Sequence, residues 1–255
     1  MAKITFLGTS SSIPTKTRDN TSFLFEYKKD IFLIDCPGSL RQKFLKLGVP
    51  YKKVNRIIIT HQHLDHIYGI ISFIHSQGYL NTGTITIYSN PDCIRLVKKL
   101  INLFNLTRPQ FPKIRYRNAF KSSLFFKKPG LTLKAIRNKH IKDSFGVKFV
   151  FGSKSLFYSS DTSFSAKTLK EAGNFNYLIH DCTASSSYFK RYPLLYRMHT
   201  NAGELSKFLE DKPKIKLIPI HFLLLEKNEE KKIQAEFKAF KKQVIFAKDF
   251  EKLSL

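Results

Sequence analysis

Three histidines and an aspartate lie within six consecutive positions of this 255-residue chain, in the segment His61-Gln62-His63-Leu64-Asp65-His66. The segment directly follows the apolar run Ile57-Ile58-Ile59, which is typical of a buried strand that delivers side chains into the loop at its end. Two histidines one residue apart can hold one metal ion, and the aspartate and third histidine can hold a second ion about 3.5–4 Å away. The alternative interpretation is that the histidines are separate surface or core residues. It is disfavoured because burying so many titratable groups without a compensating ion would be costly. The spacing therefore predicts a two-metal site.

Further His and Asp residues follow other segments that are predicted to be strands. They are His140 after the strand at 131–137, Asp161 after 155–159, His180 and Asp181 after 177–179, and His221 after 214–220. Asp35 ends the strand at 31–35, where it either orients a neighbouring metal ligand or caps a turn before Pro37. Because the arrangement recurs along the chain, we expect these side chains to converge with the 61–66 loop at one edge of the sheets.

His199 lies just before a predicted helix. Asn201 and Glu204 have the spacing of a capping box, which predicts a helix running to about Leu209. A helix N-terminus disfavours the protonated form of an imidazole unless a carboxylate faces it, and Asp181 could be that carboxylate. A histidine in a surface turn is the alternative interpretation.

The composition is that of a globular protein, with 42% hydrophobic and 25% charged residues. No linker, low-complexity tract or break in composition divides the chain, so we expect one domain over residues 1–255. The sequence has no secretory signal pattern and no apolar run near the ~18 residues of a membrane span, which favours a cytoplasmic protein with no membrane partner. Cys36, Cys93 and Cys182 are far apart and indicate neither a disulfide framework nor a thiolate zinc site.

The charge balance is strongly basic. Lys and Arg number 44 against 19 Asp and Glu, a net charge of +25 that attracts polyanions, nucleic acid first and an anionic membrane surface second. A lysine-rich proteome is the alternative explanation. Segment 107–130 is predicted to be irregular and alternates cations with aromatic residues, which is typical of a nucleic-acid surface, although such aromatics more often belong to a core. Its candidate RNA-binding residues are Arg108, Arg115, Arg117 and Lys121.

Hydrophobic periodicity predicts the remaining elements. The predicted strands are 3–7, 22–27, 31–35, 56–60, 84–88 and 145–151, and the predicted helices are 41–47, 67–74 and 91–104, with a turn region containing Gly78 and Gly83. A mixed-charge helix is expected at 226–242 and a closing edge strand at 244–247. The recurring strand-rich units predict an α/β fold in which helices cover two stacked sheets.

The residues described so far resemble the metallo-β-lactamase superfamily, whose HxHxDH motif matches His61, His63, Asp65 and His66. Within it the chain is similar to tRNase Z, the endonuclease that trims tRNA 3′ ends. The similarity extends over most of the chain and includes Phe6-Leu7-Gly8-Thr9, Tyr158-Ser159-Ser160-Asp161-Thr162, His180-Asp181-Cys182-Thr183 and His199-Thr200. It implies a four-layer αβ/βα sandwich of two mixed sheets flanked by helices, a dinuclear metal site along one edge of the sheets, and a homodimer.

The resemblance also implies roles for the candidate site residues. His61, His63 and His140 would hold one metal ion, Asp65, His66 and His221 the other, and Asp161 would bridge them. The cofactor would be two zinc ions per chain, although His/Asp sites also accept manganese or iron. The ions would activate water for in-line attack on phosphorus. His199, held by Asp181, would protonate the leaving 3′-oxygen, so Asp65, Asp181 and His199 are the expected catalytic residues, with Asp35 behind the ligands.

Three features depart from the family's pattern. Its His-Glu-Ala-Thr segment is His180-Asp181-Cys182-Thr183 here, so the acid is one methylene shorter. Only 20 residues separate His140 from Asp161, where bacterial relatives insert a long flexible arm that grips tRNA, so no such arm is expected. Residues 35–42 match the family's first motif imperfectly. The substrate would then be gripped by the basic surface, such as segment 107–130, or by a second subunit.

Three functions follow as hypotheses. The first is a metal-dependent endoribonuclease that trims the 3′ ends of tRNA precursors, which the net charge favours. The second is a small phosphodiesterase of the same fold that acts on a cyclic nucleotide or cyclic sugar phosphate, which the absent arm favours. The third is a nucleic-acid-binding protein without catalysis, which the complete set of ligand positions disfavours.

Overall fold

The computed structural model describes residues 1–78 and 83–255, so part of the predicted turn region between Gly78 and Gly83 lies outside the described residues. The strands are β1 (Ala2–Gly8), β2 (Ser22–Tyr27), β3 (Asp30–Ile34), β4 (Arg56–Ile58), β5 (Thr84–Ser89), β6 (Lys113–Asn118), β7 (Phe126–Lys128), β8 (Leu131–Arg137), β9 (Phe145–Phe151), β10 (Lys154–Tyr158), β11 (Tyr177–Asp181), β12 (Lys216–Ile220) and β13 (Lys252–Ser254). The helices are α1 (Leu40–Leu47), α2 (Leu64–Ile67), α3 (Ile70–Gly78), α4 (Pro91–Leu103), α5 (Ala166–Ala172), α6 (Ser186–Arg191), α7 (Ala202–Leu209) and α8 (Glu229–Glu236), with short 3₁₀ helices η1 (Tyr51–Lys53), η2 (Pro193–Arg197) and η3 (Lys238–Phe240).

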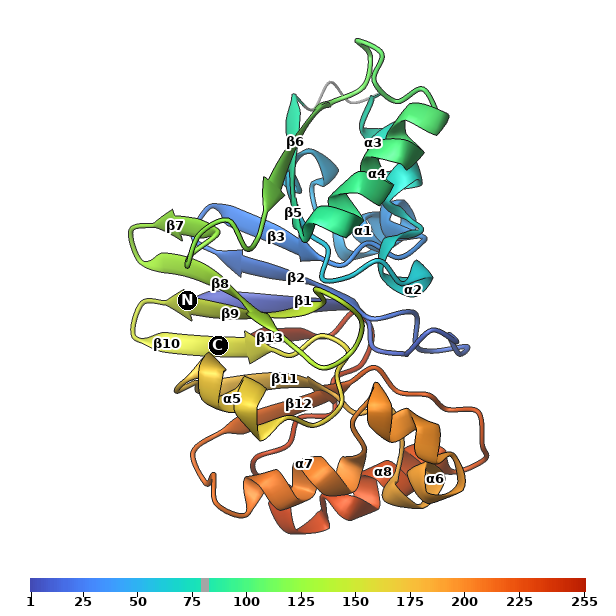
Figure 1. Ribbon diagram of the computed structural model, residues 1–255, viewed down its shortest axis with the longest axis vertical. Coiled ribbons are helices and arrows are strands. Elements are labelled where there is room, and N and C mark those ends of the chain that lie inside the picture. The colour runs from blue at the N-terminus through green and yellow to red at the C-terminus, as the bar shows by residue number, and fades with distance from the viewer. Residues whose placement is uncertain (79–82) are drawn as a thin grey trace.

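The strands form two mixed sheets. The first has the order β13-β1-β2-β3-β4-β5-β6 and the second β12-β11-β10-β9-β8-β7. In the first sheet β13 to β3 pair antiparallel and β3 to β6 pair parallel. In the second sheet β7 to β10 pair antiparallel and β10 to β12 pair parallel. Each sheet is therefore antiparallel at one end and parallel at the other, and Figure 1 shows the strands of both sheets in the middle of the molecule.

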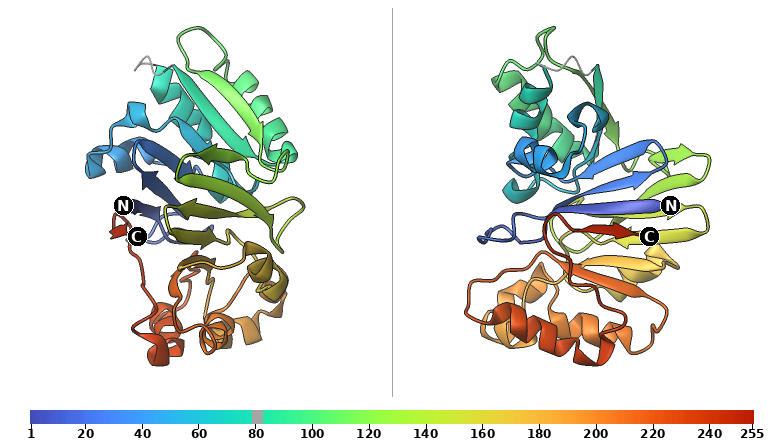
Figure 2. Two further views of the ribbon diagram at one scale, coloured as in Figure 1. Left: turned by 90° about the vertical axis from the view of Figure 1, so that its left-hand side faces the viewer. Right: turned by 180° about the vertical axis from the view of Figure 1, so that it is seen from behind.

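Three apolar clusters define four layers. The first lies between the sheets and joins residues such as Phe25 of β2 to Phe149 of β9, whose ring centroids are 4.4 Å apart. The second packs α1, α3 and α4 on the outer face of the first sheet, and the third packs α5, α7 and α8 on the outer face of the second. The two views of Figure 2 show these helices on opposite sides of the paired sheets. The predicted α/β class, with two mixed sheets flanked by helices, is confirmed.

Capping residues at the N-termini of α4 and α7 explain where these helices begin. The Asn90 side chain accepts a hydrogen bond from the Cys93 amide, and Pro91 takes the first turn of α4, where its missing N–H costs nothing. The predicted capping box is present on α7, because Asn201 and Glu204 exchange hydrogen bonds with each other's backbone amides. No helix in the described residues is long and apolar enough to cross a membrane.

Segment 107–130 is not irregular as predicted. Residues 113–118 form β6 and residues 126–128 form β7, each at the end of its sheet. The prediction failed because an edge strand has apolar residues on one face only, and the cations of the other face hid the alternation.

The C-terminal predictions need two further corrections. The helix expected at 226–242 is divided into α8 and the short η3, with Phe237 between them. Val244 makes only an isolated bridge to Leu217, so 244–247 is not a strand, and the edge strand beside β1 is β13.

Candidate metal centre

The loop after β4 carries the clustered histidines. His61 and His66 are fully buried, His63 is the N-cap of α2, and Asp65 and His66 lie within this short helix. The loop is held against the segment that follows β3, because the Cys36 amide donates to the His66 carbonyl at 2.8 Å and the Gly69 amide donates to the Cys36 carbonyl at 2.9 Å. A side chain at Gly69 would place its Cβ 1.9 Å from the Pro37 carbonyl oxygen, so this close approach requires glycine.

Three other strand ends meet this loop. His140 follows β8, Asp161 follows β10 and His221 follows β12, at the edge where these strands terminate. Ser160 (φ 56°) and His221 (φ 67°) adopt the left-handed conformation, which is uncommon for residues other than glycine. Such backbone costs about 1–3 kcal/mol and is typical of functional sites. Here it bends the chain at the two strand ends from which Asp161 and His221 extend.

The side chains form two groups that share Asp161. One group contains His61, His63, His140 and Asp161, and the other contains Asp65, His66, Asp161 and His221, with the ligand atoms of each group within 4.8 Å of one another. Asp161 Oδ2 lies 3.0 Å from His221 Nε2, 3.3 Å from His66 Nε2 and 3.8 Å from both His61 Nε2 and His140 Nε2. Ligand atoms about 2.0–2.2 Å from a tetrahedral zinc ion are roughly 3.3–3.6 Å apart. The arrangement therefore has the dimensions of two adjoining ion sites with one shared carboxylate.

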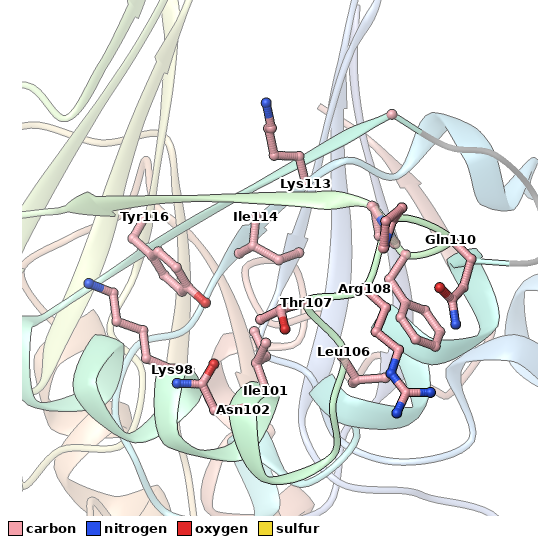
Figure 3. Close-up of a pocket in the computed structure, with 14 residues that line it drawn as sticks. Lys98, Ile101, Asn102, Leu106, Thr107, Arg108, Gln110, Lys113, Ile114 and Tyr116 are labelled. Carbon is pink, nitrogen blue, oxygen red and sulfur yellow. The ribbon is translucent and has the colours of Figure 1, made fainter.

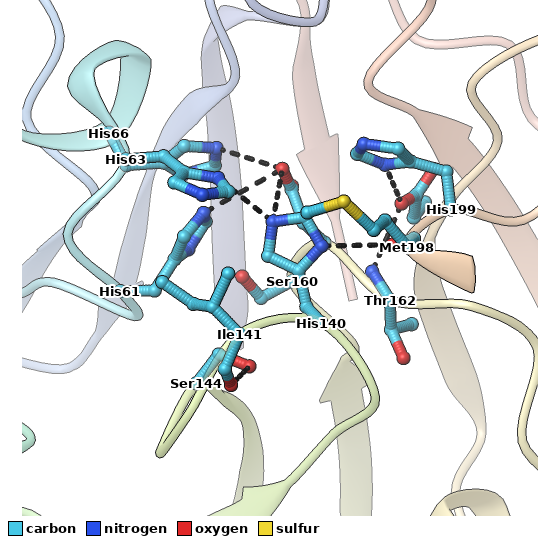
Figure 4. Close-up of polar contacts among 12 residues, drawn as sticks. His61, His63, His66, His140, Ile141, Ser144, Ser160, Thr162, Met198 and His199 are labelled. Carbon is cyan, nitrogen blue, oxygen red and sulfur yellow. Dashed lines mark hydrogen bonds and ion pairs between the residues drawn. The ribbon is translucent and has the colours of Figure 1, made fainter. Parts of the chain in front are cut away.

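Contacts at the Nδ1 atoms fix the orientation of three of the imidazole rings. His66 Nδ1 donates to Asp35 Oδ2 at 2.9 Å, and His140 Nδ1 donates to the Met198 carbonyl at 2.9 Å. His221 Nδ1 lies 3.3 Å from Thr183 Oγ1, whose hydroxyl proton goes to Asp181. A proton fixed on Nδ1 leaves the lone pair of Nε2 free for a metal ion, which is the usual arrangement behind metal-binding histidines. Figure 4 shows the rings of His61, His63, His66 and His140 directed toward one another.

The two groups contain buried nitrogen atoms without hydrogen-bond partners and buried carboxylates, and both features suit the binding of divalent cations. The Nε2 atoms of His61, His66 and His221 are buried and make no hydrogen bond within the described part of the chain. Asp35, Asp161 and Asp181 are at most 2% exposed, and Asp65 is half-buried. Four carboxylates buried together are costly unless positive charge accompanies them. Two divalent cations would supply four compensating charges, and the mixed imidazole and carboxylate donors suit zinc, manganese or iron.

The carboxylates of the two groups also favour positive charge nearby, as the pKa directions of the neighbouring histidines indicate. Burial alone would lower the pKa of His66, but Asp161 and Asp35 raise it well above its usual value. Burial also acts to lower the pKa of His221, yet Asp161 and Asp65 raise it to about 10. Burial lowers the pKa of His140 to about 4, so this imidazole is neutral near pH 7 and able to act as a ligand.

Asp35 lies directly behind the ligands. Its Oδ1 accepts the Thr60 amide at 2.8 Å, and its Oδ2 accepts His66 Nδ1 at 2.9 Å and the Tyr158 hydroxyl at 3.1 Å. Asp35 therefore contacts His66, one of the candidate ligands, and its role in orienting a metal ligand stays a prediction.

We expect Asp35→Asn to lower metal affinity about 10–100-fold, because partners behind a ligand orient it and raise its basicity. Competition with a chromophoric chelator measures the affinity. Glu229→Gln is the matched control, since Glu229 is a buried carboxylate outside both groups that accepts the Ser185 amide at 2.8 Å. Equal metal affinity in the Asp35 variant and the parent would contradict the role of Asp35.

His199 lies beside the two groups and is held by Asp181. His199 Nδ1 is 2.9 Å from Asp181 Oδ2, and its ring stacks on that of His221 at 5.2 Å. Asp181 also accepts the Thr162 amide at 3.0 Å, so the shorter acid still reaches His199 from a fixed position. The His199 side chain is 17% exposed, which leaves its far nitrogen reachable from solvent.

The predicted RNA-binding residues do not lie in these groups. Arg108 is in the loop after α4, Arg115 and Arg117 are on β6, and Lys121 is in the turn after it, and all four are exposed. The neighbouring aromatics Phe120, Phe125 and Phe126 pack partly buried against the cluster between the sheets. The aromatics of this segment are thus largely core, while its cations face solvent.

Three groups that contact the candidate ligands or Asp35 were not predicted from the sequence. Thr60 Oγ1 contacts Asp35, His61 and Ser160 at once, at 3.0, 3.1 and 2.8 Å. The Tyr158 hydroxyl reaches Asp35, and the Met198 carbonyl fixes His140. Thr60 precedes the ligand motif directly and could have been noticed, but a backbone carbonyl leaves no signal in a sequence.

Comparisons with known proteins give a family and a fold. A family model described as "Anti-Pycsar protein Apyc1" matches residues 2–246. A ribonuclease Z of Bradyrhizobium diazoefficiens is 31% identical over 156 residues, which cover 60% of this chain and 50% of that protein. A ribonuclease Z of Methanothermobacter thermautotrophicus is 44% identical over 79 residues, 31% of this chain and 26% of that protein. The chain therefore spans about a quarter to a half of the length of these curated relatives.

Solved structures share the whole fold. The metallo-β-lactamase fold protein YhfI from Bacillus subtilis superposes with a TM-score of 0.80 at 19% identity and covers 99% of this chain and 98% of its own. The short form of human tRNase Z superposes with a TM-score of 0.79 at 20% identity, over 99% and 98% of the two chains. The predicted metallo-β-lactamase fold and the similarity to tRNase Z are confirmed.

Proposed function

We propose that this chain, which belongs to the anti-Pycsar protein Apyc1 family, is a metal-dependent phosphodiester hydrolase of the ribonuclease Z type. The observation that supports the proposal is the convergence of seven candidate ligand side chains, from segments up to 160 residues apart, at Asp161 and beside a carboxylate-held histidine. We infer a pair of zinc ions as the cofactor, with His61, His63 and His140 on one ion, Asp65, His66 and His221 on the other, and Asp161 between them.

Different residues of the chain would contribute to different parts of the reaction. Bound divalent cations would supply an activated water and neutralise charge on the phosphate oxygens. Asp35, Thr183 and the Met198 carbonyl keep protons on the outward nitrogens of His66, His221 and His140, so the inward nitrogens stay available. As the bond from phosphorus to the leaving oxygen breaks, His199 Nε2 gives that oxygen a proton, and Asp181 stabilises the imidazolium before transfer.

The first candidate substrate is the 3′ end of a tRNA precursor. Relatives named ribonuclease Z and the net charge of +25 support it. The expected products are a tRNA that ends in a 3′-hydroxyl and a trailer with a 5′-phosphate, because the leaving 3′-oxygen takes the proton and the water oxygen joins phosphorus.

The second candidate substrate is a small cyclic phosphodiester. Two observations support it. The 20 residues between His140 and Asp161 contain the β9–β10 hairpin, with no insertion that could reach a large RNA. The family model that covers nearly the whole chain has a description other than ribonuclease Z.

One assay separates the two substrates. The zinc-loaded protein is incubated in parallel with a 3′-extended tRNA transcript, a cyclic mononucleotide and bis(p-nitrophenyl) phosphate, and the RNA ends are mapped. Cleavage at the tRNA 3′ end that weakens steeply with salt would establish the first candidate. Rapid turnover of the cyclic mononucleotide with intact tRNA would establish the second. Failure to hydrolyse any of the three with zinc, manganese or iron would refute the proposed hydrolase.

We further propose a cytoplasmic homodimer. The three cysteines are free and buried, which suits a reducing compartment. The dimer rests on the resemblance to tRNase Z and is tested by light scattering after size exclusion. The single domain without a long arm stays a prediction.

A further inference from the structure

The basic residues of this chain are concentrated in one stretch. Residues 93–142, between Asp92 and Asp143, contain fourteen Lys or Arg and no acidic residue. The other 205 residues contain 30 Lys or Arg together with all 19 acids. A uniformly lysine-rich composition would not produce this contrast within a single chain. We call residues 93–142 the acid-free stretch.

The cations of the acid-free stretch are exposed and mostly unpaired. Thirteen of the fourteen are exposed, the half-buried Lys134 being the exception. In the part of the chain that the structure describes, only Arg95, Lys128 and Arg137 of this set form an ion pair, with Asp92, Asp30 and Asp143. Such charge is not used to stabilise the fold, and it raises the local concentration of anions at the surface.

Three of these cations form a row on β6. Lys113, Arg115 and Arg117 alternate with Ile114 and Tyr116, and alternate residues of a strand share a face. Ile114 and Tyr116 pack toward α4, where Lys98 Nζ lies 5.0 Å from the centre of the Tyr116 ring. Figure 3 shows Ile114 and Tyr116 on the α4 side of the strand and Lys113 directed to the other side.

The row faces solvent because the second sheet does not cover it. The apolar cluster between the sheets includes Tyr88 of β5 but no residue of β6. The second sheet ends at β7 and does not extend over β6. The row therefore lies on an uncovered inner face, at a spacing of about 6.6 Å per cation. Cations in a line at this spacing can each meet a successive phosphate of an extended strand.

The row leads toward the metal centre. β6 is parallel to β5, and Arg117 pairs with Tyr88 near the C-terminal end of both strands. Just beyond that end, the Asn90 side chain donates to the Asp143 carbonyl at 3.1 Å, in the loop that carries His140. The acid-free stretch ends in this loop, where exposed Lys139 and Lys142 flank His140.

We propose that the inner face of β6, together with Lys139 and Lys142, is a binding surface for single-stranded RNA that guides a substrate strand to the metal centre. The proposal rests on the proposed hydrolase function, because the guided strand is its substrate. In this proposal a fixed surface at the sheet edge holds the substrate strand. RNA is favoured over an anionic membrane because the cations follow a strand in a line and end beside a metal ligand.

The test measures RNA binding separately from hydrolysis. A fluorescein-labelled 15-nucleotide uridine RNA is titrated with the zinc-loaded protein over a range of salt concentrations, and anisotropy is read directly after mixing, with a gel to verify intact RNA. The variant is Lys113→Gln/Arg115→Gln/Arg117→Gln. The matched control is Lys167→Gln/Lys170→Gln/Lys207→Gln, which removes three exposed lysines from α5 and α7 on the outer face of the second sheet, far from β6 in Figure 1. Turnover of bis(p-nitrophenyl) phosphate by each protein verifies the fold and the metal centre.

The β6 variant is expected to bind the RNA at least tenfold more weakly at about 0.1 M salt. The slope of log affinity against log salt should fall by about 2, since each contact with single-stranded RNA contributes roughly 0.7. The control should bind within twofold of the parent. Unchanged binding by the β6 variant, an equal loss in the control, or binding of the parent to phosphatidylserine vesicles but not to RNA would each overturn the proposal. Absence of small-diester turnover in the parent would refute the hydrolase instead.

Discussion

Replacing Asp161 with alanine is expected to abolish hydrolysis by releasing both metal ions. Its Oδ2 lies within 3.8 Å of a nitrogen from each of four histidines, two in each ligand group. The loss should span several orders of magnitude, because a water molecule that no metal ion activates keeps a pKa far above the value of about 7 that a bound zinc ion gives it. Elemental analysis of the purified variant, together with its rate on bis(p-nitrophenyl) phosphate, measures both effects.

His63→Ala should have a different metal content from Asp161→Ala although its activity is equally lost. His63 belongs to one ligand group only, whereas Asp161 belongs to both. We therefore expect His63→Ala to retain about one ion per chain and Asp161→Ala to retain close to none. Asp211→Ala, which changes an exposed aspartate outside the groups, is the control. Two ions per chain in the Asp161 variant would rule out the shared carboxylate.

His199→Ala is expected to slow hydrolysis about 10²–10⁴-fold while metal content stays unchanged, the size of contribution that a positioned general acid makes. The residue belongs to neither of the two four-residue groups that share Asp161, but its ring lies 5.2 Å from that of His221 and its Nδ1 is held by Asp181. It thus lies beside the candidate metal centre without being required to hold the inferred metal pair.

The leaving group provides the test that distinguishes a proton donor from a structural residue. p-Nitrophenolate leaves without help from an acid, whereas a ribose or alkyl oxygen requires a proton. The variant should therefore lose much less activity on bis(p-nitrophenyl) phosphate than on a diester with an alkyl leaving group. Asp181→Asn should show the same selectivity to a smaller degree, and His75→Ala on α3 serves as the control. An equal loss on both substrates would refute the proton-donor role.

The sequence determined the candidate ligand loop and most of the strands that carry the candidate ligands. Two local patterns could be recognised without knowledge of the fold. They are the spacing of His61 to His66 after an Ile run, and the His or Asp residues at the ends of other strands. The capping box of α7 was predictable for the same reason, since its two hydrogen bonds join residues three positions apart. The separation of Lys and Arg from acidic residues can also be read from the sequence alone.

Only the tertiary structure decided which of these residues meet, because their contacts join positions far apart in the chain. Asp35 could have been a turn residue until its carboxylate was found 2.9 Å from His66, and the Met198 carbonyl behind His140 is a backbone contact that no residue type encodes. The cations of segment 107–130 were visible in the sequence, but their order in a row was not. That row exists because residues 113–118 pair with β5 at the end of a sheet, where the second sheet leaves their inner face uncovered.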